Sequence, residues 1–122
     1  MIIDEHDLVV EFKNNIVYLN YLDSLSIDKL VPILAEVEEI IKDVEDPVHL
    51  VADITKLNNI SIESRKYGIE WTRSTKINKI AVFGGNVFMK HLINLIIMAS
   101  GRKENFRIFK TKHEAEEWIL NH

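Results

Sequence analysis

Residues that commonly carry out chemistry are present in this chain, but they do not form catalytic patterns. Cysteine is absent, which excludes disulfides, thiolate metal sites and cysteine nucleophiles, and fits a reducing compartment. The five histidines lack a metal-binding spacing such as H-E-x-x-H. No serine lies in the G-x-S-x-G turn that activates a nucleophile. We therefore expect no enzymatic activity, no catalytic residue, no bound metal and no cofactor, and instead a protein that works by binding.

A second group of residues follows the buried strands that the sequence predicts. In an open parallel sheet, ligands bind beyond the carboxyl ends of the strands, where the N-termini of the following helices also point. Backbone N–H groups and the positive end of the helix dipole favour an anion there. The sequence thus predicts a ligand- or partner-binding edge composed of Asp53, Thr55, Ser61, Gly84, Gly85 and Asn86.

These edge residues also have structural interpretations. Ser61, Asn86 and Thr111 suit the N-cap position, where each would contribute about 1 kcal/mol, and we expect capping to be their main role. The glycine pair at 84–85 belongs to neither a Walker loop nor a G-x-G-x-x-G motif, so we expect a tight strand-to-helix turn. Asp53 ends an apolar strand, and its carboxylate must reach water or accept hydrogen bonds nearby. It either braces its own loop or touches a ligand.

Composition and charge narrow the class of protein. A chain of 122 residues with 47% apolar and 28% charged residues is typical of one globular domain, here 1–122. The net charge of −4 argues against general nucleic-acid binding, which depends on neutralising phosphates. The N-terminus is acidic where a signal peptide would be basic, and no apolar stretch is long enough to cross a membrane. We expect a cytoplasmic protein that is not transmembrane and has no nucleic-acid partner.

Alternating strand and helix patterns account for almost all of the chain. The expected elements are strands at 8–13, 16–22, 48–54, 79–83 and 106–109, and helices at 26–43, 61–76, 86–99 and from 111 onward. Asn14 and Asn15 tolerate positive φ and suit a tight hairpin turn between the first two strands. The order β-β-α-β-α-β-α-β-α predicts an α/β fold with a mixed, mainly parallel sheet of four to five strands and flanking helices.

The helix expected at 86–99 has an unusually wide apolar arc. The arc spans roughly 200°, about twice the stripe that a surface helix needs. Either neighbouring elements bury both flanks, or part of the arc meets a second protomer or an amphiphile. A homodimer would cover such a flank symmetrically. The candidate dimer or amphiphile surface consists of Phe88, Met89, Leu92, Ile93, Ile96 and Ile97.

The helix expected at 61–76 has two different faces. One face groups small residues with two aromatic residues, Tyr67 and Trp71, and we expect it to pack on the sheet. The opposite face mixes isoleucines with Arg65, Lys66 and Arg73. It is either a solvated face or a docking site for an acidic partner or membrane headgroups.

Three stretches of the chain resemble STAS domains. Residues 48–60 (VHLVADITKLNNI) resemble the strand and loop that open the central part of those domains, and residues 79–85 and 106–119 resemble their later strands and closing helix. The most similar branch is the SpoIIAA-like one, which is also compared with CRAL-TRIO lipid carriers. The resemblance implies a non-enzymatic regulatory module, similar to anti-sigma-factor antagonists, that binds a protein partner. The alternative is a small carrier or sensor of an apolar or amphipathic, lipid-like ligand.

The resemblance also directs attention to a serine. Anti-sigma-factor antagonists of this superfamily carry a phosphorylatable serine in an Asp-Ser-Ser-Gly context, where the central strand leads into the next helix. The matching stretch here is 59–64 (NISIES), which keeps Ser61 and Ser64 but lacks that string. If the domain has a phosphoswitch, Ser61 is the candidate phosphosite, because a phosphate there would lie at the positive end of a helix.

Overall fold

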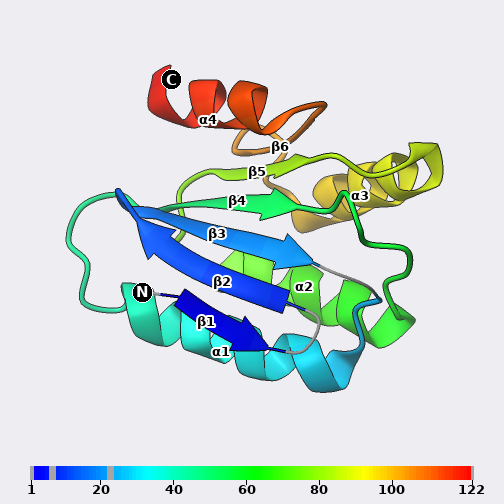
Figure 1. The fold of residues 1–122 in the computed structure, drawn as a ribbon, viewed down its shortest axis with the longest axis horizontal. Helices are drawn as coiled ribbons and strands as arrows, with labels where there is room; N and C mark the ends of the chain where they lie inside the picture. Colours follow the sequence, from blue (N-terminus) through cyan, green and yellow to red (C-terminus); the bar gives the residue numbers. More distant parts are fainter. Residues whose placement is uncertain (1, 6–7, 22–23, 122) are drawn as a thin grey trace.

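A six-stranded sheet forms the centre of the molecule (Figure 1). The computed structural model describes residues 2–5, 8–21 and 24–121. The elements in chain order are β1 (Ile2–Glu5), β2 (Leu8–Lys13), β3 (Ile16–Tyr21), α1 (Ile27–Ile41), β4 (His49–Asp53), α2 (Ile62–Ser74), β5 (Ile80–Phe83), α3 (Val87–Ser100), β6 (Phe106–Phe109) and α4 (Lys112–Asn121).

The strands lie side by side in the order in which they occur in the chain. The pairs β1–β2 and β2–β3 are antiparallel, and the three pairs from β3 to β6 are parallel. The predicted α/β class, the mixed and mainly parallel sheet and the order of the nine expected elements are confirmed. Strand β1 was not predicted, because four residues with two acidic side chains give no alternating pattern, so the sheet has one strand more than expected.

The hairpin between β2 and β3 forms at the predicted asparagine pair. Asn14 has a φ of 55° and Asn15 a φ of 62°. Positive φ at both central residues defines a type I′ turn, whose twist matches that of the two strands. The turn therefore fixes the register in which Lys13 lies opposite Ile16.

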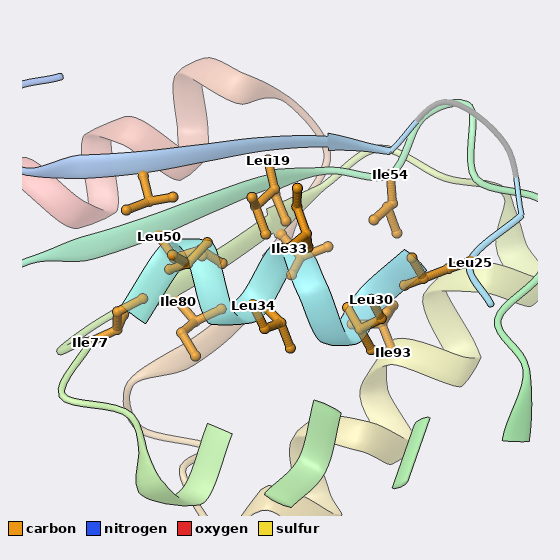
Figure 2. Packing of buried hydrophobic residues seen from close by; sticks show 14 of the residues in the cluster. Leu19, Leu25, Leu30, Ile33, Leu34, Leu50, Ile54, Ile77, Ile80 and Ile93 are labelled. Atoms are coloured by element: carbon orange, nitrogen blue, oxygen red, sulfur yellow. The ribbon is translucent and has the colours of Figure 1, made fainter. Parts of the chain in front are cut away.

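The helices cover the two faces of the sheet unequally. From β3 to β6, each parallel strand lies beside the preceding one, so the sheet grows in one direction. Because the connections between parallel strands are right-handed, the helices α1, α2 and α3 within these connections lie on the same face. Helix α4 lies on the opposite face (Figure 1), where Ala115, Trp118 and Ile119 pack on Val51 and Ala81. The face with three helices holds the main core, which Figure 2 shows between α1 and the sheet.

The apolar arc of α3 is divided between the core and the surface. The side chains of Met89, Leu92, Ile93 and Ile97 are buried in the main core, and Ile96 is half-buried. This corrects the predicted dimer or amphiphile surface: four of its six residues are core residues, because the sheet contacts the helix along the 89–93–97 line. The exposed apolar stripe consists of Val87, Phe88, Leu95 and Met98.

This division of α3 predicts the effect of a charge at two neighbouring positions. Ile97 is 7% exposed and Leu95 is 51% exposed. We expect Ile97→Glu to lower the free energy of unfolding by about 3 kcal/mol or more, because it removes core packing and buries a charge. Leu95→Glu should change the stability of the single protomer by less than about 0.5 kcal/mol, measured at a protein concentration low enough for the chain to be monomeric. Urea unfolding followed by circular dichroism measures both, and equal losses would contradict this orientation of the helix.

Candidate functional site

The loop that follows β4 is braced by its own aspartate. Asp53 ends the strand and is half-buried, and its Oδ1 accepts a hydrogen bond from the backbone N–H of Thr55 at 2.9 Å. This is the side-chain-to-backbone pattern of an Asx turn. Of the two interpretations of Asp53, the structure shows the bracing role, and it leaves the Thr55 side chain exposed at the edge of the sheet.

The loop that follows β5 packs tightly against the loop that follows β4. Gly84 and Gly85 have φ values of 85° and 84°, in the left-handed region that favours glycine. A Cβ on Gly84 would overlap the hydroxyl of Thr55, and a Cβ on Gly85 would lie 2.9 Å from Cδ1 of Ile54. The glycine pair therefore forms the predicted strand-to-helix turn and allows the two loops to touch.

The predicted caps at this edge are present. The Ser61 Oγ accepts from the backbone N–H of Ser64 at 3.2 Å, and the Asn86 Oδ1 accepts from that of Met89 at 2.8 Å. Thr111 and Glu114, at the start of α4, accept reciprocally from each other's backbone N–H groups in a capping box. The oxygens of Ser61 and Asn86 thus satisfy helix N–H groups, as expected from the sequence.

Ser61 connects α2 to the segment that precedes α1. Its hydroxyl donates to the Oγ of Ser64 at 2.9 Å, and Ser64 in turn donates to the carbonyl of Leu25 at 3.1 Å. The backbone N–H of Ser61 also donates to the Leu25 carbonyl. Ser61 is half-buried, whereas Ser64 is 1% exposed. A modifying enzyme could therefore reach Ser61 but not Ser64 in the folded domain.

A polar hollow lies on the face of the sheet that α4 covers only in part. It has a volume of about 180 Å³. Its lining includes Glu11, Tyr18, Asn20, Asp53, Phe83 and Lys112. The Tyr18 hydroxyl donates to Glu116 at 2.5 Å, and burial together with this bond raises the pKa of Tyr18. Sequence reasoning missed this surface, although Glu11 and Lys13 in β2 and Tyr18 and Asn20 in β3, spaced two residues apart in each strand, could have indicated it.

An apolar cavity of about 110 Å³ lies on the opposite side of the sheet, beneath α1, α2 and α3. Leucine and isoleucine side chains form most of its lining. Tyr21 also lines it, and burial raises the pKa of its phenol, which therefore stays neutral. This cavity could not be predicted from the sequence, because its existence depends on how three helices pack together.

No group of three or more histidine, aspartate or glutamate side chains that could hold a metal ion occurs among residues 2–5, 8–21 and 24–121. Within the same ranges, no helix is long and apolar enough to cross a membrane.

The fold of this chain is similar to those of solved protein structures. No curated protein matches the sequence. An uncharacterized protein of the DUF3478 family with a SpoIIAA-like fold, from Shewanella loihica PV-4, is 15% identical, with 92% of this chain and 91% of that chain covered and a TM-score of 0.67. An anti-sigma factor antagonist from Mycobacterium paratuberculosis is 14% identical in sequence and has a TM-score of 0.67. The match covers 98% of this chain and 100% of that chain. The STAS-like, SpoIIAA-like fold implied by the sequence is confirmed.

The sequence itself also matches a family model. The match covers residues 10–122 and thus nearly the whole chain. The chain therefore belongs to the domain family of unknown function DUF7793.

Proposed function

We propose that this protein is a non-enzymatic regulatory module that binds a protein partner in the manner of an anti-sigma-factor antagonist. The observation that carries the proposal is the likeness in fold to an anti-sigma factor antagonist, which extends over 98% of this chain and the whole of that one. The edge of the sheet supports it. Asp53, Ser61 and Asn86 direct their oxygens to neighbouring backbone N–H groups, which favours a role in shaping a surface over a role in catalysis.

The contact surface that we propose is the edge formed by the loops at 54–61 and 84–86. The two loops touch through Thr55 and Gly84, so they present one continuous surface. Ile62 begins α2 directly after the Ser61 cap and is 61% exposed. Ile62 stands between the polar residues Ser61 and Glu63, and protein interfaces combine an apolar centre with a polar rim.

The proposal predicts which of two exposed apolar residues matters for binding. We expect Ile62→Glu to reduce the affinity for the partner about tenfold or more, because it places a charge at the centre of the contact. The partner is captured with the tagged full chain from cells of the source organism and identified by mass spectrometry, and its affinity for each variant is then measured.

The matched control is Leu120→Glu, since Leu120 is 70% exposed on α4, away from the loops at the carboxyl edge. It should bind like the unmodified protein. Equal affinities for the two variants, or a larger loss for Leu120→Glu, would contradict the proposed surface.

If the domain is regulated by phosphorylation, we propose that Ser61 is the residue that is phosphorylated. A phosphate at this N-cap would add nearly two negative charges at the proposed contact surface, at the positive end of α2. Ser61→Asp should keep the cap and weaken partner binding, whereas Ser61→Ala should lose about 1 kcal/mol of stability and bind normally. Calorimetric titration with the purified partner compares them. An unchanged affinity for a folded Ser61→Asp variant would count against the switch.

We further propose that the protein is a homodimer, held through the exposed stripe of α3. Phe88 is 66% exposed and Met98 is 74% exposed, and two-fold pairing would cover both in each chain. At micromolar concentration, we expect the unmodified protein to sediment as a dimer and the Leu95→Glu variant as a monomer. A monomeric unmodified protein would rule the dimer out. Ile97→Glu is unsuitable for this test, because its buried position would confuse unfolding with dissociation.

A further inference from the structure

The apolar cavity beneath the helices has the size and lining of a site for a small molecule. Its volume is about 110 Å³. Leu19, Leu50 and Ile80 line it from the sheet, and Leu34 of α1 and Ile93 of α3 line it from the helices (Figure 2). For comparison, an apolar cavity of about 150 Å³ in another protein stays dry and binds benzene. The space in this core is smaller than that one and suits a compact five-membered ring or a short chain.

A glycine in the middle of α2 keeps part of this space open. Gly68 lines the cavity and lies in the interior of the helix, where glycine lowers helix stability relative to alanine. A Cβ placed on it would have no heavy atom within 4 Å, in contrast to Gly84 and Gly85, and its φ is not in the left-handed region. Neither backbone strain nor close packing therefore requires glycine here. Its evident effect is that no side chain enters the cavity at this point.

One turn further along α2, a residue that lines the cavity carries a buried hydrogen-bond donor without a partner. Trp71 lines the cavity, and its Nε1 is buried without a partner. The other buried side-chain nitrogen or oxygen without a partner in the described ranges is Nδ1 of His49, which does not line this cavity. The hydroxyl of Thr72 donates to the Gly68 carbonyl at 2.7 Å, and the Nε of Arg65 donates to the Ile60 carbonyl at 3.0 Å. A buried donor without a partner is costly, and a ligand can supply the missing acceptor.

We propose that this cavity binds a small, mostly apolar molecule that carries an oxygen acceptor for the indole N–H of Trp71. Because this cavity is smaller than the one that binds benzene, a ligand of about four to six non-hydrogen atoms has a suitable size. A ketone and a carboxylate share the required acceptor, and a carboxylate would also find the Arg65 guanidinium at the lining. Ile54, Leu57 and Ile60 of the loop at 54–61 also line the cavity, so the site lies beneath part of the proposed contact surface. The inference rests on the cavity lining and on Trp71, and does not depend on partner binding at that surface.

The two tryptophans allow binding to be followed directly. Trp118 is the second of the two in the chain and packs on the opposite face of the sheet, so a Trp118→Phe variant leaves Trp71 as the reporter. We expect cyclopentanone or isobutyrate to change the fluorescence of Trp71 saturably and to raise the melting temperature of the unmodified protein. Methylcyclopentane, similar in shape to cyclopentanone but without an acceptor, should bind about tenfold more weakly. The absence of saturable binding by all three probes would overturn the proposal.

Two variants test separately the contribution of the cavity volume and that of the Trp71 N–H group to binding. Gly68→Leu should fill the cavity and weaken binding of the better oxygen probe at least tenfold, with an unchanged or higher melting temperature. The matched control Ala35→Leu adds the same side chain at an exposed position of α1 and should bind normally. Trp71→Phe, followed by thermal shift, should weaken binding of that probe but leave the binding of methylcyclopentane unaffected. Unchanged binding of the oxygen probe by both Gly68→Leu and Trp71→Phe would overturn the proposal.

Discussion

The order of the strands constrains the rest of this structure. Each strand from β3 to β6 is added beside the preceding one, and the crossovers between them place α1, α2 and α3 on a single face. The carboxyl ends of β4 and β5 and the N-termini of α2 and α3 are consequently brought to one edge. The same constraint leaves the opposite face to α4, so that one face holds the apolar core and the other keeps an open polar hollow.

The edge of the sheet acquires its shape from bonds within its own loops. Asp53 braces one loop, the glycine pair at 84–85 allows the second loop to approach it, and Ser61 ties α2 to the carbonyl of Leu25 through Ser64. A surface assembled in this way is preorganised, which lowers the entropic cost of binding a protein. It is also sensitive to charge at Ser61, because that residue belongs to both the bond network and the exposed edge.

Local features of the fold could be predicted from the sequence, whereas features that depend on packing could not. The turn at Asn14 and Asn15 and the caps at Ser61 and Asn86 follow from the conformational preferences of single residues. A helical wheel shows how wide an apolar arc is, but it does not show which side of the arc the neighbouring elements cover. The wheel therefore assigns Ile97 to a surface, although its side chain belongs to the core. The cavity beside Gly68 results from the spacing of three helices, for which the sequence contains no local pattern.

Hydrogen exchange of the domain, free and bound to its captured partner, tests the central claim that the edge of the sheet is the contact surface. Backbone N–H groups at 54–61 and 84–86 should exchange more slowly in the complex, while those on the exposed side of α1 and throughout α4 should keep their rates. Slowing confined to α1 or α4, with the edge unchanged, would contradict the claim.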